Sequence, residues 1–198
     1  MESLYNTFRI KLSLVPMDYF RSFHEQIKWE SRLICIMGQK GVGKSTMILQ
    51  HIRKYDNLDE TLYVTADNMY FAGHTLYELA GTFYSQGGKR LYIDEIHKYK
   101  GWSTEVKNIY DDYPTLQLVY SGSSLLALRK GNKADLSRRS IPYEMPGLSF
   151  REYLNIRNGW KLKSSQFEDV LRYDGNIGSE AKETDVCPCQ ERPIQAKQ

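Results

Sequence analysis

The stretch GQKGVGKST, Gly38–Thr46, contains the residue types that bind phosphate groups. Gly38, Gly43, Lys44 and Ser45 match the pattern G-x-x-x-x-G-K-[ST], and an apolar run enters the pattern while a helix-forming run leaves it. Glycines allow backbone conformations in which successive N–H groups converge on a β-phosphate, at the positive end of the following helix. The lysine adds a charge at the β- and γ-phosphates, and the serine hydroxyl is placed to coordinate Mg²⁺. The alternative, a glycine-rich turn with a solvated lysine, fits this order of strand, loop and helix less well.

A pair of acidic residues, Asp94 and Glu95, ends the apolar run in RLYIDEIHK. At the end of a strand beside a phosphate loop, the aspartate can hold the Mg²⁺ shell, and the adjacent glutamate can polarise the attacking water. Acidic residues that cap a following helix would be the commoner explanation of such a pair on its own. Together with the upstream loop, the pair predicts a metal ligand at Asp94 and a water-activating group at Glu95.

Further polar groups are candidates for the γ-phosphate end of the site. The strand-like run LQLVYSGSS ends in serines, of which Ser121 or Ser123 could hydrogen-bond the water or a γ-oxygen, although serines are also common in turns. In LSRRSIPYEM, Arg138 or Arg139 could reach a neighbouring subunit's γ-phosphate and stabilise charge there. Two solvated arginines at the start of a strand are an equally good explanation.

A competing signal for guanine recognition lies in GNKADL, where Asn132, Lys133 and Asp135 have the spacing N-K-x-D. That motif should directly follow an apolar strand, but the charged run RKG precedes it here. GTP hydrolysis also calls for Asp-x-x-Gly at the second motif, whereas Asp94 is followed by Glu-Ile-His. We interpret NKAD as a coincidence in a charged loop and keep a GTPase as an alternative.

The elements that must position these residues follow from alternating strand-like and helix-like runs. Apolar runs of strand length occur at Leu33–Met37, Leu62–Thr65, Arg90–Ile93 and Leu116–Tyr120, with a fifth near Ser140–Met145. Helix-like stretches between them predict an α/β fold with a parallel sheet and helices on both faces.

The flanks of the sheet have their own patterns. Tyr19, Phe20, Phe23 and Ile27 recur at helical spacing, which predicts an entry helix in 17–29. After the sheet, SFRE and SQFE have the Ser-x-x-Glu spacing of capping boxes and predict two short helices, which begin near Ser149 and Ser165. The polar end of the chain is aromatic-free and predicts a disordered tail. We therefore expect an N-terminal segment 1–30, a nucleotide domain 31–147, a partial helical lid 148–175 and a tail 176–198.

Composition limits the classes of protein that fit. The chain has 198 residues, 41% hydrophobic and 26% charged, with a net charge of +3 that does not indicate nucleic acid as a partner. Three cysteines, one of them in an apolar run, do not form a disulfide framework. With no long apolar run and no secretory signal pattern, we expect a cytoplasmic protein without a membrane partner.

Taken together, GQKGVGKST, LYIDEIHKYKGW, LVYSGSS and MPGLSFREYL make the chain resemble the AAA+ superfamily of P-loop ATPases over about Leu33–Leu154. Within it, the chain is similar to prokaryotic proteins whose AAA+ domain precedes a C-terminal restriction-endonuclease-like domain of uncertain function. The resemblance implies a three-layer P-loop NTPase sandwich, with a mostly parallel sheet, followed by a helical lid. We expect the lid to be short and incomplete here, and the second domain to be missing.

The resemblance also implies roles for individual residues. Asp94 and Glu95 would be the Walker B pair, the serines of SGSS the sensor, and Arg139 the arginine finger that acts across a homo-oligomer. His97 is interpreted as an ordinary surface or packing residue and Trp102 as a core anchor of a helix. The Walker A loop that binds ATP and Mg²⁺ would be Gly38, Gln39, Lys40, Gly41, Val42, Gly43, Lys44, Ser45 and Thr46.

Three functions are compatible with these residues. The first is an ATPase that hydrolyses Mg-ATP to ADP and phosphate to drive a conformational change. The second is a truncated nucleotide-binding interaction module with little or no hydrolysis, and the third is the GTPase. No motif identifies the macromolecular partner on which the nucleotide cycle acts.

Overall fold

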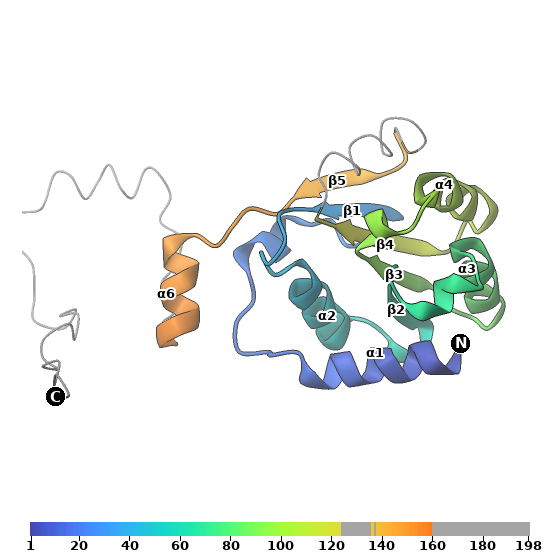
Figure 1. The fold of residues 1–198 in the computed structure, drawn as a ribbon. Coiled ribbons are helices and arrows are strands. Elements are labelled where there is room, and N and C mark those ends of the chain that lie inside the picture. The colour runs from blue at the N-terminus through green and yellow to red at the C-terminus, as the bar shows by residue number, and fades with distance from the viewer. Residues whose placement is uncertain (124–135, 137, 160–198) are drawn as a thin grey trace, which may run out of the picture. The chain divides into compact units, whose positions relative to one another are not determined.

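The computed structural model describes residues 1–123, 136 and 138–159 (Figure 1). Its strands form a five-stranded parallel sheet in the order β2-β3-β4-β1-β5. The strands are β1 Leu33–Met37, β2 Thr61–Thr65, β3 Arg90–Asp94, β4 Gln117–Gly122 and β5 Ile141–Glu144. The helices are α1 Glu2–Leu14, α2 Lys44–Tyr55, α3 Leu76–Ser85, α4 Trp102–Asp112 and α6 Phe150–Asn158, with short 3-10 turns at Ser22–Gln26, Leu58–Glu60, Met69–Ala72 and Ile96–Lys98.

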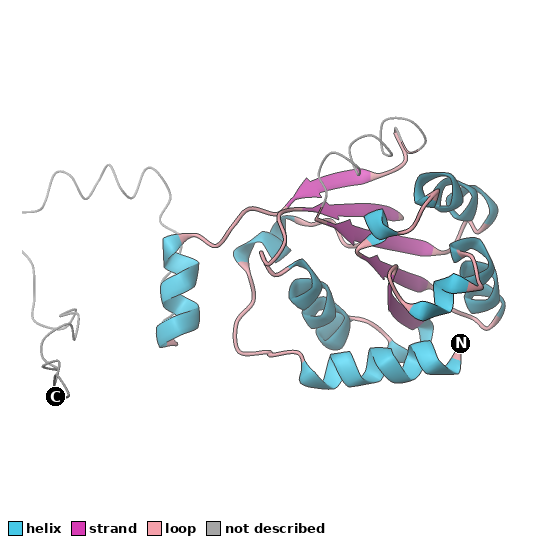
Figure 2. Cartoon of the chain, in the orientation of Figure 1, coloured by secondary structure: helices cyan, strands magenta, loops and turns pink. Residues whose placement is uncertain are grey.

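Helices cover both faces of the sheet (Figure 2), with α1 and α2 on one side and α3 and α4 on the other, as labelled in Figure 1. All five residues of β1 are buried, as expected for a central strand of a parallel sheet that is covered on both faces. The edge strand β5 is mostly exposed and contains Pro142, which such a strand tolerates because β1 is its only strand partner in the part of the chain that the structure describes. The predicted α/β three-layer sandwich is confirmed, and β4 lies between the loop strand β1 and the acidic strand β3.

The prediction of an entry helix in 17–29 is wrong. That stretch forms only the 3-10 turn Ser22–Gln26, whereas the N-terminal helix is α1, whose buried residues Leu4, Phe8 and Leu12 recur every four positions. The helix stops before Pro16, since the residue before a proline is restricted to extended conformations. Phe23 and Ile27 are nevertheless buried in the core, whereas Tyr19 and Phe20 are only partly buried, so half of the predicted stripe packs without being a helix.

After β5 the chain enters α6 through the predicted capping box. Ser149 Oγ accepts a hydrogen bond from the backbone N–H of Glu152, and the Glu152 carboxylate accepts from the backbone N–H of Ser149. The second predicted capping box at Ser165, the tail 176–198 and the NKAD run lie outside the described residues. Among the helices that are described, none is both long enough and apolar enough to cross a membrane.

Candidate functional site

The glycine-rich loop connects the carboxyl end of β1 to the first turn of α2. Gly41 and Gly43 have φ values of +85° and +97°, which other residues rarely adopt. A Cβ at Gly38 would lie 2.6 Å from the main-chain oxygen of Met145, so the backbone after β5 occupies the space that a side chain would need. The side chain of Lys44 is buried, and its Nζ donates to the carbonyl oxygens of Gly38 and Gln39 at 2.9 Å each.

Asp94 stands beside this loop at the end of β3. Its Oδ2 accepts a hydrogen bond of 2.5 Å from Ser45 Oγ and one of 2.6 Å from the hydroxyl of Tyr63. Its Oδ1 accepts from Ser121 Oγ and, at 3.0 Å, from the backbone N–H of Glu95. The structure thus brings together the predicted metal ligands Ser45 and Asp94 and the predicted sensor Ser121, and it adds Tyr63, which the motifs did not indicate.

Glu95 has the left-handed backbone conformation, with φ +53°, that is unfavourable for a non-glycine residue and is often found at functional sites. Ser123 Oγ donates to its Oε2 at 3.3 Å, and His97 Nε2 and Lys98 Nζ lie 3.6 and 4.0 Å from the same oxygen. The two serines of β4 and the turn after it therefore face different carboxylates, Ser121 that of Asp94 and Ser123 that of Glu95. His97, interpreted above as a surface or packing residue, belongs to the surroundings of Glu95.

The charges of the site affect one another. Burial lowers the pKa of Lys44, while the nearby Glu95 and Asp94 carboxylates oppose that shift and favour the ammonium form. Burial, followed by the charge of Asp94, raises the pKa of Tyr63, so its phenol remains a donor.

The donor set fits Mg²⁺ only together with a ligand. No group of three or more His, Cys, Asp or Glu residues in the described part of the chain could hold a metal by itself. Ser45 and Asp94 offer oxygen atoms 2.5 Å apart, and Mg²⁺ commonly binds through one or two such protein groups, with water and phosphate oxygens completing its octahedron. The site therefore suits Mg²⁺ that arrives with phosphate.

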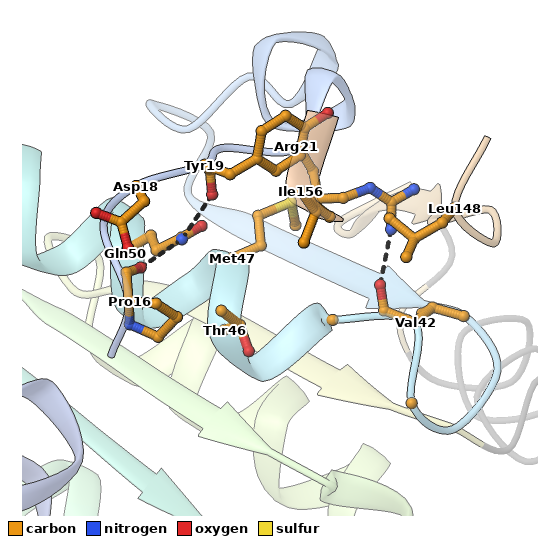
Figure 3. A pocket seen from close by; sticks show the side chains of 12 residues that line it. Pro16, Asp18, Tyr19, Arg21, Val42, Thr46, Met47, Gln50, Leu148 and Ile156 are labelled. Carbon is orange, nitrogen blue, oxygen red and sulfur yellow. Dashed lines mark hydrogen bonds between the residues drawn. The ribbon is translucent and has the colours of Figure 1, made fainter. Parts of the chain in front are cut away.

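A pocket of about 320 Å³ adjoins the outer side of the loop (Figure 3). Its walls come from the N-terminal segment, the loop, α2 and the region of α6. Gln50 Nε2 donates to the carbonyl oxygens of Pro16 and Tyr19 at 2.6 and 2.9 Å and so holds the N-terminal wall against α2. The residues that line the pocket are Pro16, Asp18, Tyr19, Arg21, Gly41, Val42, Gly43, Thr46, Met47, Gln50, Leu148 and Ile156.

Arg21 contacts three segments around this pocket: the loop, the segment after β5 and α6. Its guanidinium donates to Val42 O of the loop at 2.7 Å and to Pro146 O and Gly147 O after β5 at 3.1 and 3.0 Å. It also forms a buried ion pair of 2.9 Å with Glu152 of α6. No sequence motif marks Arg21, since its partners come from distant parts of the chain.

The predicted arginine finger does not reach this site from within its own chain. Arg139 precedes β5 and so lies at the amino edge of the parallel sheet, whereas the loop lies at the carboxyl edge. Its guanidinium pairs with Asp111 at the end of α4, with nitrogen and oxygen 3.1 Å apart. Arg138 is exposed and has φ +68°. Trp102 is buried at the start of α4 against Tyr120, as predicted for a core anchor.

A phosphate loop between a parallel strand and a helix, with an aspartate from another strand beside its serine, defines a P-loop nucleotide-binding domain. The sequence profile of an AAA domain matches residues 30–154, and the chain belongs to this family. An uncharacterized protein of Methanocaldococcus jannaschii is 30% identical over 153 residues, which cover 72% of this chain and 31% of the relative. The chain thus spans less than a third of that relative's length.

Proposed function

We propose that the chain binds Mg-ATP at the loop Gly38–Thr46 and hydrolyses it to ADP and phosphate. The observation that carries this proposal is the 2.5 Å contact between Ser45 Oγ and Asp94 Oδ2 at the mouth of the loop, with Glu95 directly after Asp94. A serine and an aspartate in contact are what a Mg²⁺–phosphate complex needs, and a second carboxylate beside them can act on water.

The loop N–H groups and Lys44 would bind the β- and γ-phosphates. For this, Lys44 Nζ would leave the carbonyl oxygens of Gly38 and Gln39 and donate to phosphate oxygens instead. Ser45 and Asp94 would hold Mg²⁺, which would offset the negative charge of the phosphates. Glu95 orients a water and takes its proton as the water oxygen attacks the γ-phosphorus. The bond to the β–γ bridging oxygen then breaks, and Lys44 stabilises the charge that develops on ADP.

Ser121 and Ser123 would act through the carboxylates that they contact. Ser121 fixes Oδ1 of Asp94, and Ser123 keeps the Glu95 carboxylate turned toward the end of β4. Under this proposal both serines are positioning residues, and neither needs to contact the γ-phosphate.

We place the base and ribose in the pocket beside the loop. The pocket has the size of small-ligand sites in proteins, and it shares Gly41, Gly43 and Thr46 with the phosphate loop. Apolar groups from Met47, Leu148 and others can cover a purine ring there. Displacement of a bound fluorescent nucleotide by ATP or by GTP tests which base the site prefers. A preference for GTP would favour the GTPase alternative.

Two variants test the reaction itself. Lys44→Ala should abolish nucleotide binding, whereas Glu95→Gln should retain ATP and lose phosphate release. Lys89→Ala is the matched control, because Lys89 is exposed and pairs with Glu60 away from the loop. Binding by Lys44→Ala equal to that of Lys89→Ala would refute the site. Binding without phosphate release by the unmodified chain would instead support the nucleotide-dependent interaction module.

A further inference from the structure

Tyr63 contributes a hydrogen bond to the metal site that none of the sequence motifs describes. It lies in the middle of β2, the edge strand that pairs with β3, and only 3% of it is exposed. Its hydroxyl donates to Oδ2 of Asp94, the oxygen that also faces Ser45. Strand β2 flanks β3 on the side away from β4 and β1, so this donor comes from a strand that carries none of the motif residues.

The ring of Tyr63 is in turn held by the N-terminal helix. The Phe8 ring of α1 stacks on it, with ring centroids 6.3 Å apart and planes at 27°. The ammonium group of Lys11, one turn further along α1, lies 5.2 Å from the centre of the Tyr63 ring, within cation–π range. One side chain therefore connects α1 directly to the metal-binding carboxylate.

We propose that Tyr63 is a positioning residue for Asp94 and that α1 sets the position of Tyr63, so that the placement of the N-terminal helix controls Mg²⁺ binding at the nucleotide site. The proposal rests on the proposed function. It adds to that function a residue and a regulatory element that phosphate-loop chemistry does not require.

The physical reason lies in how the two carboxylate oxygens are shared. Ser121 and the backbone N–H of Glu95 donate hydrogen bonds to Oδ1 of Asp94, while Ser45 and Tyr63 donate to Oδ2. Ser45 is itself expected to bind the metal, so Tyr63 is the donor to Oδ2 that has no other task in the reaction. Without it, the metal would have to order that oxygen as it binds, and a higher Mg²⁺ concentration would be needed.

Tyr63→Phe removes only the hydroxyl and tests the first half of the proposal. In the full chain, we expect the Mg²⁺ concentration that half-saturates binding of a fluorescent ATP analogue to rise about tenfold, which corresponds to about 1.4 kcal/mol. Binding of the same analogue in EDTA should not change, because the loop and Lys44 are untouched. A purely structural role would lower stability and leave the Mg²⁺ dependence as it was.

Tyr92→Phe is a closely matched control. Tyr92 is 2% exposed, lies on β3, and donates a bond of 2.6 Å to the carboxylate of Asp56, which follows the far end of α2. It should lower thermal stability as Tyr63→Phe does and leave the Mg²⁺ half-saturation point unchanged. Equal Mg²⁺ half-points for the two variants would overturn the role of Tyr63.

Phe8→Leu tests the contribution of α1 and does not alter Tyr63. We expect it to raise the Mg²⁺ half-point about threefold in the unmodified chain and not at all in the Tyr63→Phe background. The same increase in both backgrounds would show that α1 does not act through Tyr63. If the unmodified chain binds no Mg²⁺-nucleotide, the proposed function fails; if it binds and the variants leave its Mg²⁺ dependence unchanged, only the present inference fails.

Discussion

The buried ion pair between Arg21 and Glu152 provides a quantitative test of how the pocket beside the loop is held together. The side chains are each 7% exposed, and Arg21 also donates to three carbonyl oxygens in the loop and after β5. Replacing Arg21 with Met keeps most of the apolar stem but leaves the Glu152 carboxylate buried without a cation. Removing one partner of a buried pair costs about 3–5 kcal/mol. Of the carbonyls that lose a donor, those of Pro146 and Gly147 belong to exposed residues and can bind water instead.

Urea unfolding measures this loss. With a slope of about 2 kcal/mol per molar urea, the midpoint should fall by about 1.5–2.5 M in Arg21→Met. The control is Arg139→Met, which breaks an ion pair with Asp111 whose side chains are 35% and 42% exposed and should cost less than about 1 kcal/mol. Adding Glu152→Gln to Arg21→Met should recover part of the loss, since it removes the unpaired charge. Equal midpoints for the two arginine variants would refute the view that this ion pair holds the pocket together.

Three further outcomes follow from the geometry. Burial raises the pKa of Glu152 and its bonds to Arg21 and Ser149 lower it, and the net effect is a decrease. The stabilisation from the ion pair should therefore be fully present above the ordinary glutamate pKa of 4.5 and be lost as pH falls through the lower pKa of the folded state. Urea midpoints measured between pH 7 and pH 3 would reveal this loss. Gly38→Ala should abolish nucleotide binding in an equilibrium titration because its Cβ has no room, whereas Gly147→Ala, with open space around it, should bind normally. If Arg139 acts on a neighbouring copy, a mixture of Arg139→Ala and Lys44→Ala chains should release phosphate faster than either variant alone, because the Lys44→Ala chain still supplies Arg139 to the intact loop of the other.

The centre of the site could be predicted because its geometry is local or follows from simple sheet rules. Gly38, Lys44 and Ser45 belong to one strand–loop–helix unit, so their spacing already places them together. Asp94 and Ser121 end other strands, and the carboxyl ends of parallel strands meet at one edge of the sheet. The pattern of apolar runs was therefore enough to bring these residues to one place.

The surroundings of the site could not be predicted in the same way. Tyr63 occupies the middle of an apolar strand, where a tyrosine is most simply a core residue, and its hydroxyl partner depends on how β2 pairs with β3. Arg21 meets Glu152 across 131 positions of sequence, which no local pattern encodes. Helix α1 did leave a signal in the spacing of Leu4, Phe8 and Leu12, but the aromatic stripe further along suggested a helix that the chain does not form.

Apart from the bond between Tyr63 and Asp94, these unpredicted contacts involve the first thirty residues, which pack against the loop, α2 and Tyr63. Arg21 binds the loop through Val42 O, the carbonyls of Pro16 and Tyr19 are held by α2, and Phe8 packs on the tyrosine that contacts Asp94. A nucleotide that contacts this wall is linked to the placement of the N-terminal segment. Because such coupling is reciprocal, the bound nucleotide stabilises the segment by the same free energy that the segment contributes to nucleotide binding. If Tyr63 positions Asp94 as proposed, a partner that displaces α1 would weaken Mg²⁺-nucleotide binding without contacting the phosphate loop.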